Sequence, residues 1–541
     1  MRRDGTRSEA KRSSGGRRRR AALFGVAVAA LSAVVVAQPA GAQSISNGVT
    51  YGSDAVVGHR RGGGGLGVGG ALAIGVGLGV LGAIAAQSAA ADEPGRPPRR
   101  ARVIELEDDL PPGADPGPGR PRPPKTVQVV TNPNVRVPSR TETRFVPGEV
   151  LIEVKAGGKI EPIATRLGLE VLSSLPIRLT GSTLHRLRAR DGRSTVDVLT
   201  RLRQERTIAF AQPNWVYTLQ QEVAGATPGD GSATASVLGG TTAAQAAAAD
   251  VETAAAGIPA GPLPGQYAAG KLNLSGAHGR VRGHGVLVAV IDTGADTTHP
   301  ELVGAVEDSF DALEGAPKTP GVHGTAMAGA VAARLRLAGA APGARLLLAR
   351  AFGPPAANGV AQGSTFHVVA CLDWAVGRGA KVVSMSFAGP SNDLLTRALA
   401  AAKAKGVIAV AAAGNAGPQS PPLFPAADPG VIAVTASDPD DRILPAANRG
   451  THVLVTAPGV DILVATPQGG YDLTSGTSVA AAEVSGVVAL LAEKRGDLKP
   501  DEARRILAET AIDLGPKGRD PIFGAGLVDA DAAVAAASRA R

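Results

Sequence analysis

The stretch Val286-Leu-Val-Ala-Val-Ile-Asp-Thr-Gly294 decides the fold class of this 541-residue chain. Its apolar residues run without a polar break and then meet an aspartate, a threonine and a glycine. A continuous run of this kind is typical of a strand buried on both faces, as in a parallel sheet. Ligands of such sheets bind beyond the carboxyl ends of the strands, so Asp292 stands where a functional residue is expected.

Similar apolar runs recur downstream and alternate with helical patterns. This alternation predicts an α/β domain over residues 265–541, with a mostly parallel sheet and helices on both of its faces. The predicted strands cover Val286–Ile291, Arg345–Ala351, Lys381–Phe387, Gly406–Ala412, Gly430–Ala436 and His452–Thr456, and two of the helices cover Ser364–Gly377 and Asp393–Lys405.

Four polar residues stand at predicted strand ends or helix starts, where one crevice could collect them. Asp292 and Asn415 follow strands, His323 opens a helical pattern, and Ser478 heads the apolar helix that runs to about Lys494. A serine hydroxyl becomes a good nucleophile when an imidazole removes its proton, and a carboxylate fixes the tautomer of that imidazole. A side-chain amide and a helix N-terminus can stabilise a developing oxyanion. The set predicts nucleophilic acyl transfer.

The motifs around these residues resemble those of the subtilisin-like serine peptidases, the subtilases, over residues 265–530. The resemblance implies the subtilisin-like fold, with Ser478 as nucleophile, His323 as base, Asp292 as its partner and Asn415 as oxyanion donor. It rests on several blocks in the family's order rather than on any one of them. The blocks are Ala289-Val-Ile-Asp-Thr-Gly294, His299-Pro-Glu-Leu302, His323-Gly-Thr325, Val383-Ser-Met-Ser386, Ala413-Gly-Asn-Ala-Gly-Pro418, Ala457-Pro-Gly459, Gly476-Thr-Ser-Val-Ala480 and Phe523-Gly-Ala-Gly-Leu-Val-Asp529.

The same resemblance implies which residues bind a substrate and which cofactors to expect. It assigns the substrate backbone to Ser386, Phe387, Ala388, Gly389, Ala413 and Gly414. No cofactor and no metal site are expected from the residues, and calcium is implied only at the level of the family, because no carboxylate cluster has calcium-loop spacing.

A smaller α+β unit is predicted upstream, over residues 141–220. Its strand and helix patterns follow a β-α-β-β-α-β order, typical of a ferredoxin-like domain. Val146-Pro-Gly-Glu-Val150 and Gln212-Pro-Asn-Trp-Val-Tyr217 resemble the ends of a subtilase propeptide, which implies a folding assistant and an intramolecular inhibitor. Residues 221–264 are rich in Ala, Gly, Thr and Pro and are expected to be a linker that contains the processing site.

Each candidate residue taken singly also has an ordinary structural explanation. Asp292 could form an Asx turn, Ser478 could be a helix N-cap and Asn415 a turn residue. Departures from the family pattern point the same way. Ser386-Phe-Ala-Gly389 differs from the usual Ser-Leu-Gly-Gly, and Ala482-Glu483 replaces a usual Pro-His. The alternative function is therefore a non-catalytic, membrane-tethered subtilase-like binding or scaffold protein, although four ordinary explanations at four matching positions would be a coincidence.

The first 140 residues have the composition of a leader region. Arg17–Arg20, the apolar stretch 21–37 and Ala40-Gly41-Ala42 predict a signal peptide over residues 1–42, with an uncleaved anchor as the alternative. Residues 43–140 are predicted to be a glycine-rich apolar segment and a Pro/Arg-rich spacer. Within them, residues 62–86 could span a membrane or form a flexible linker. An exported protein, secreted or held in the cell envelope, is expected.

Charge and cysteine content exclude other classes. The net charge of +9 would suit a nucleic-acid partner, but residues 265–541 carry 24 basic and 25 acidic side chains, so the excess lies in the leader region. Protein or peptide substrates and the chain's own residues 141–220 are the expected partners. The single cysteine, Cys371, excludes disulfides and a cysteine-based zinc site, and its apolar surroundings predict a buried side chain rather than a nucleophile.

Overall fold

The computed structural model describes residues 131–219, 263–313, 315, 319–355 and 359–539. The predicted signal peptide, the segment 62–86, most of the Pro/Arg-rich spacer and almost all of the linker 221–264 lie outside the described residues. None of the helices within the described ranges is long and apolar enough to cross a bilayer.

A seven-stranded sheet forms the centre of the C-terminal domain, and every pair of neighbouring strands in it is parallel. This confirms the predicted fold class. In the middle of the sheet, Val288 of one strand lies beside Val382 on one side and Leu346 on the other. In spatial order the strands are β14 (Val455–Pro458), β13 (Ile432–Ser437), β12 (Ile408–Ala412), β10 (Val382–Met385), β5 (Leu287–Asp292), β7 (Arg345–Arg350) and β6 (Val306–Asp311).

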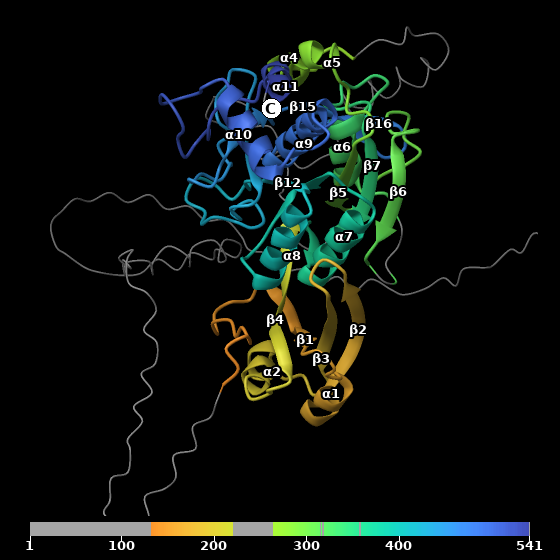
Figure 1. The fold of residues 1–541 in the computed structure, drawn as a ribbon, viewed down its shortest axis with the longest axis vertical. Coiled ribbons are helices and arrows are strands. Elements are labelled where there is room, and N and C mark those ends of the chain that lie inside the picture. The colour runs from red at the N-terminus through yellow and green to blue at the C-terminus, as the bar shows by residue number, and fades with distance from the viewer. Residues whose placement is uncertain (1–130, 220–262, 314, 316–318, 356–358, 540–541) are drawn as a thin grey trace, which may run out of the picture. The chain divides into compact units, whose positions relative to one another are not determined.

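Helices cover both faces of this sheet (Figure 1). Alternate residues of β5 belong to opposite cores: Val288 and Val290 pack on the side of α6 and α9, and Ala289 and Ile291 on the side of α7 and α8. The first side also holds the short helices from the two ends of the domain. The helices are α4 (Tyr267–Lys271), α5 (Leu274–His278), α6 (Val322–Ala332), α7 (Thr365–Gly377), α8 (Asp393–Ala404), α9 (Thr477–Lys494), α10 (Pro500–Thr510) and α11 (Ala530–Arg539).

The upstream unit has the predicted β-α-β-β-α-β order. Its strands β2, β3, β1 and β4 are adjacent in that order, and all their pairs are antiparallel. Helix α1 ends at Leu167, because Gly168 takes a left-handed backbone (φ 64°) that terminates the helix and leads directly into the next strand at Leu169. The elements are β1 (Phe145–Val154), α1 (Glu161–Leu167), β2 (Leu169–Ile177), β3 (Ser182–Ala189), α2 (Thr195–Leu202) and β4 (Ile208–Leu219).

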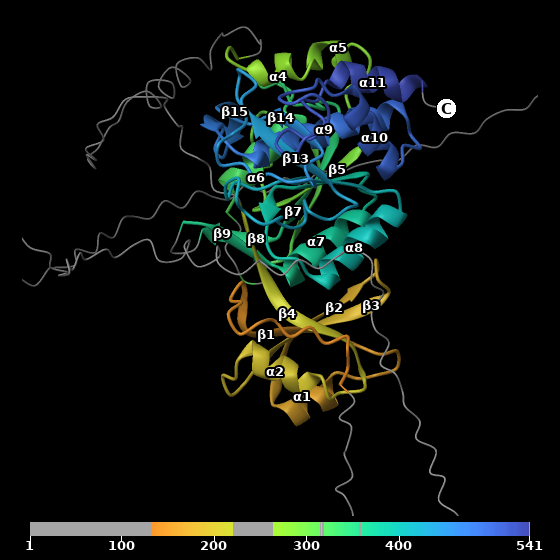
Figure 2. The same ribbon diagram turned by 90° about the vertical axis from the view of Figure 1, so that its left-hand side faces the viewer.

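Strand β4 belongs to both parts of the chain. Its first half pairs with β1, and its last residues pair with two short strands of the C-terminal domain, β9 (Ala361–Ser364) and β11 (Phe387–Ala388). Figure 2 shows β4 running from the upstream sheet toward β8 (Phe352–Pro355) and β9. These short strands were not predicted from the sequence, nor was the hairpin of β15 (Ile462–Thr466) and β16 (Gly470–Thr474).

A buried carboxylate organises the loop that follows α6. Glu301 is fully buried, and its oxygens accept hydrogen bonds from the backbone N–H groups of Leu335, Arg336 and Leu337 at 2.8–3.1 Å. The hydroxyl of Tyr471, from β16, donates to it at 2.9 Å. One carboxylate therefore holds the loop after α6 against the β15–β16 hairpin.

We predict that Glu301→Gln destabilises the protein. The amide would turn an N–H group toward backbone donors that now share carboxylate oxygens, so the free energy of unfolding should fall by about 3 kcal/mol. Urea unfolding followed by circular dichroism measures the change. The matched control is Glu307→Gln, which removes only an exposed ion pair with Arg345 and should cost less than about 1 kcal/mol. Equal stability of the two variants would contradict this account of the loop.

Helix α9 contains a second buried glutamate, at the position where the family usually has histidine. The side chain of Glu483 is buried, and its Oε2 has no hydrogen-bond partner among the described residues. Burial raises the pKa of Glu483 well above the ordinary value of 4.5. The folded state therefore keeps this proton at pH values where the unfolded state has lost it, and stability falls as the pH rises above about 4.5.

We predict that Glu483→Gln stabilises the protein at pH 8 and has little effect at pH 4. The neutral amide removes the cost of a buried ionisable group, a cost that exists only above the ordinary pKa of glutamate. Thermal unfolding of parent and variant across this pH range tests the sign. Glu509→Gln, which is exposed and paired with Arg505, should show no such trend. A Glu483→Gln midpoint equal to or below that of the parent at pH 8 would overturn the prediction.

Candidate active site

Asp292 is the last residue of β5 and lies at the carboxyl edge of the sheet. It is 1% exposed, and its Oδ1 accepts hydrogen bonds from the backbone N–H of Thr293 at 2.7 Å and from the Thr293 hydroxyl at 3.2 Å. The same hydroxyl accepts a hydrogen bond from the N–H of Gly324, at the start of α6, at 3.0 Å. These bonds fix the carboxylate and tie the end of β5 to the helix that carries His323.

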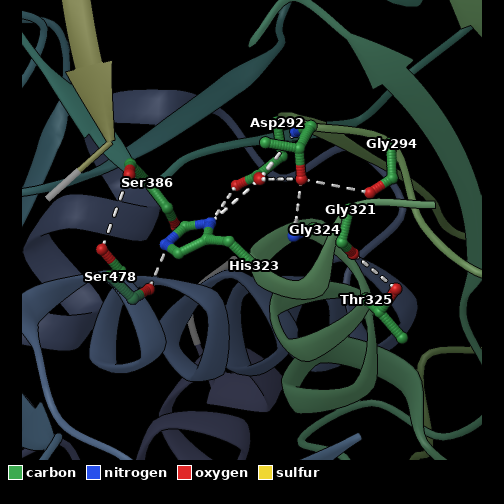
Figure 3. Close-up of polar contacts among 9 residues, drawn as sticks. Asp292, Gly294, Gly321, His323, Gly324, Thr325, Ser386 and Ser478 are labelled. Carbon is green, nitrogen blue, oxygen red and sulfur yellow. Dashed lines mark hydrogen bonds and ion pairs between the residues drawn. The ribbon is translucent and has the colours of Figure 1, made fainter. Parts of the chain in front are cut away.

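His323 is the second residue of α6, and its imidazole faces Asp292. Nδ1 lies 2.8 Å from Oδ2 and 2.9 Å from Oδ1 of the carboxylate. Figure 3 shows the ring between Asp292 and Ser478, with its other edge turned toward the serine. When Nδ1–H donates a hydrogen bond to Asp292, Nε2 of a neutral ring presents its lone pair on the edge that faces Ser478.

Two glycines allow α6 to begin so close to the strand end. A Cβ added to Gly321 would lie 1.8 Å from the Thr293 hydroxyl oxygen, and one added to Gly324 would lie 2.0 Å from the carbonyl oxygen of Gly294. Both distances are far below van der Waals contact, so a side chain at either position would push the helix away from β5. The close approach of His323 to Asp292 depends on this absence of side chains.

Ser478 is the second residue of α9 and is 5% exposed. Its Oγ lies 3.5 Å from the carbonyl oxygen of Ser386, and the Ser386 hydroxyl donates to the carbonyl oxygen of Ser478 at 3.1 Å. These contacts join the start of α9 to the segment after β10, as Figure 3 shows. The position at a helix N-terminus places the positive end of the helix dipole beside the serine.

Asn415, shortly after β12, is held by the residue that precedes Ser478. Its Oδ1 accepts hydrogen bonds from the backbone N–H of Thr477 at 3.1 Å and from the Thr477 hydroxyl at 2.9 Å. The amide oxygen is thereby fixed, so the NH₂ group is oriented as well. It lies along the start of α9, where a Cβ on Gly476 would be 2.9 Å from Nδ2. The amide can donate to an oxygen that develops next to Ser478.

Part of the predicted substrate-binding segment 386–389 lines a groove that strand β4 occupies. Phe387 and Ala388 form β11 and pair with Leu219 and Thr218 of β4 in antiparallel register. On its other edge, β4 pairs with β9, where Val216 lies opposite Ser364. The β9 side of the groove was not predicted from the sequence, because a four-residue strand shows no clear pattern.

The other two predicted binding residues take part in the framework of the site. The N–H of Ala413 donates to the carbonyl oxygen of Val434 at 2.9 Å, and that of Gly414 donates to the Thr477 hydroxyl at 3.1 Å. These bonds hold the backbone that leads into Asn415, and the contact of the two residues with a substrate stays a prediction. A cavity of about 480 Å³ opens beside His323 and is lined by Leu219, Phe352 and Ala361 among others.

Three further features concern residues outside this set. His299 is fully buried, with its Nε2 bonded to the carbonyl oxygen of Gly470 and its Nδ1 accepting from the N–H of Glu301, so it supports the loop structure. Cys371 is buried on α7, and burial raises the pKa of its thiol, as expected of a packed residue. Within the described ranges, no group of three or more His, Cys, Asp or Glu side chains could hold a metal ion.

Comparisons with known proteins identify the two parts of the chain. The subtilase family model, Peptidase_S8, matches residues 283–526, and the model of the fervidolysin N-terminal prodomain matches residues 131–214. Fervidolysin from Fervidobacterium pennivorans is 36% identical over 285 residues, which cover 47% of this chain and 41% of that protein. Subtilisin Savinase from Lederbergia lenta is 35% identical over 262 residues, which cover 48% of this chain and 94% of that protein.

A solved structure is similar across both parts. The crystal structure of fervidolysin, described as a keratinolytic enzyme related to subtilisin, aligns with a TM-score of 0.59 and 26% identity over 75% of this chain and 63% of that one. The aligned region thus spans less than two thirds of fervidolysin, whereas nearly the whole of Savinase is matched. The chain belongs to the subtilase family of subtilisin-like serine peptidases and carries a fervidolysin-type prodomain.

Proposed function

We propose that this chain is made as an exported precursor and becomes a serine endopeptidase. The observation that carries the proposal is the pair of contacts at 2.8 and 2.9 Å between Nδ1 of His323 and the buried carboxylate of Asp292, with Ser478 on the far side of the ring. Intact Asp, His, Asn and Ser at the four positions give a non-catalytic scaffold no support. Export rests on the leader pattern of residues 1–42, outside the described residues.

The chemistry follows from which atoms face one another. Ser478 Oγ attacks the carbonyl carbon of the peptide bond while its proton passes to Nε2 of His323, and Asp292 stabilises the resulting imidazolium. The carbonyl oxygen becomes an oxyanion, and the Asn415 amide and the backbone N–H of Ser478 donate to it. His323 then gives the proton to the departing amine. A water molecule, activated by the same imidazole, hydrolyses the ester on Ser478.

The groove between β9 and β11 supplies the binding mode. An extended peptide inserted there gains main-chain hydrogen bonds on both edges, which is β-strand addition to a preformed site. The last residues of β4 occupy this position now. We infer that residues 141–220 inhibit the precursor by lying where a substrate would lie, and that cleavage within 221–264 allows their release.

Contacts outside the groove hold the prodomain to α7 and α8. The N–H of Leu179 donates to Asp373 on α7 at 2.7 Å, and Glu153 pairs with Arg397 on α8 at 2.7 Å. Asn214 accepts a hydrogen bond from the N–H of Phe366 at 3.2 Å. These contacts support a prodomain that binds one face of the enzyme as well as its groove.

Replacing Ser478 by Ala should abolish peptide hydrolysis, lowering kcat/KM by about 10⁴-fold or more, because the nucleophile is lost. Casein hydrolysis and labelling by a fluorophosphonate probe measure the loss, and the precursor should remain uncut in 221–264 unless another peptidase cuts it. Cys371→Ser is the matched control, because that buried side chain lies outside the site. Retained labelling of Ser478→Ala would refute the role of Ser478.

Replacing Asn415 by Leu should lower kcat by about 100- to 1000-fold and leave KM nearly unchanged, because one donor to the oxyanion is removed. Steady-state kinetics on a chromogenic peptide separate the two parameters. A loss of less than threefold in kcat, or a loss confined to KM, would contradict the role given to Asn415.

A further inference from the structure

Tyr217 is the most deeply buried part of β4 within the groove. The side chain is fully buried, although it belongs to the prodomain and packs against residues of the catalytic domain. Its backbone pairs with Gly363 of β9, two residues before Leu219, which pairs with Phe387 of β11. A substrate peptide that takes the place of β4 must put a side chain at this point.

The pocket that holds Tyr217 is shaped for an aromatic ring. The Phe387 ring meets it edge to face, with the centroids 5.6 Å apart. Gly389 forms part of the wall, and a Cβ added there would lie 2.5 Å from the Tyr217 ring. Any side chain at position 389 would therefore take the space of the ring. Although Ser386-Phe-Ala-Gly389 differs from the usual Ser-Leu-Gly-Gly, it retains the glycine that the ring requires.

The end of the pocket is polar. The Tyr217 hydroxyl donates to the carbonyl oxygen of Pro390 at 3.2 Å and accepts a hydrogen bond from the Nδ2 amide of Asn392. Both the donor and the acceptor capacity of the hydroxyl are thus used. Burial raises the pKa of Tyr217, so the hydroxyl stays neutral and able to donate.

The catalytic domain itself orients Asn392. Its Oδ1 accepts a hydrogen bond from the N–H of Leu395 at 2.8 Å and so caps the N-terminus of α8. With the oxygen committed to the helix, the NH₂ group must face the pocket. The prodomain adds only one bond to the same oxygen, from Gln212 at 3.2 Å, so the orientation does not depend on the prodomain.

We propose that the processed enzyme selects peptides with tyrosine at the fourth position before the scissile bond, counting the residue next to that bond as the first. We propose further that Asn392 recognises the tyrosine hydroxyl through a hydrogen bond. This preference rests on the proposed peptidase function. The strand register supports this position. One residue beyond the Leu219–Phe387 pair, a substrate residue lies opposite Ser386, whose carbonyl oxygen is 3.5 Å from Ser478 Oγ. We take this residue as the one whose carbonyl is attacked, directly before the scissile bond. Counting back from that residue, the Tyr217 pocket receives the fourth.

The physical basis is the cost of leaving buried polar groups unpaired. A phenylalanine in this pocket would fill it equally well but remove the hydroxyl that donates to the Pro390 carbonyl and accepts from the Asn392 amide. The amide would keep only its longer contact with the Thr365 hydroxyl, at 3.5 Å. Sites built around a substrate hydroxyl reject the analogue that lacks it much more strongly than apolar pockets reject a missing methylene. Tyrosine should therefore be favoured over phenylalanine by at least about 10-fold in kcat/KM.

The experiment compares two peptides on the processed enzyme obtained from the full-length chain. They are the coumarylamide of acetyl-Tyr-Thr-Leu-Gln, the sequence of residues 217–220, and that of acetyl-Phe-Thr-Leu-Gln, which differs only in its first residue. Active sites are counted with a fluorophosphonate probe. A Tyr/Phe ratio in kcat/KM of about 10 or more supports the proposal, and a ratio below about 2 overturns it.

The variant Asn392→Ser tests the residue. Serine keeps an oxygen that can cap α8 but does not carry the amide to the Tyr hydroxyl, so the Tyr/Phe ratio should fall to about 3 or less. The exposed neighbour provides the control, Ser391→Ala, which should keep the wild-type ratio. An unchanged ratio in Asn392→Ser overturns the role of Asn392. The absence of both probe labelling and turnover of either peptide would instead refute the peptidase function on which the preference rests.

Discussion

The contact between the His323 ring and the Asp292 carboxylate is the interaction on which the site depends. It determines which nitrogen of the ring carries the proton and therefore which nitrogen can act on Ser478. To make it, α6 must begin against the end of β5, which only glycine at positions 321 and 324 permits. The parallel sheet provides the rest, because its carboxyl edge collects residues that lie almost 190 positions apart in the chain, from 292 to 478.

Strand β4 uses the same edge from outside the domain. It satisfies the main-chain groups of β9 and β11 and fills the pocket beside Asn392 with Tyr217. A segment that completes a sheet is also a template on which slowly forming non-local pairs can assemble, so inhibition and assistance with folding can arise from one contact surface. Release of β4 would leave an open groove, and the contacts that β4 makes there indicate which groups a substrate would meet.

Much of the fold could be predicted because its signals are local. β5 and β12 are built on continuous apolar runs; Asp292 ends β5, and Asn415 lies three residues after the end of β12. The strands β9 and β11 could not be predicted, because runs of four and two residues are too short to show a pattern. They are strands through their pairing with β4 and, for β9, also with β8. The roles of Asn392 and Glu301 could not be predicted either, because they depend on partners far away in the chain. These partners are Tyr217 for Asn392 and the loop after α6 for Glu301.

The central claim is that Ser478 is the nucleophile activated by His323. Mass spectrometry of the protein after reaction with a fluorophosphonate tests it most directly, because the covalent adduct marks the activated hydroxyl. The account predicts a single phosphonylated serine, located in the peptide that contains Ser478. An adduct on a different serine, or an unmodified Ser478 in protein that hydrolyses peptides, would contradict it.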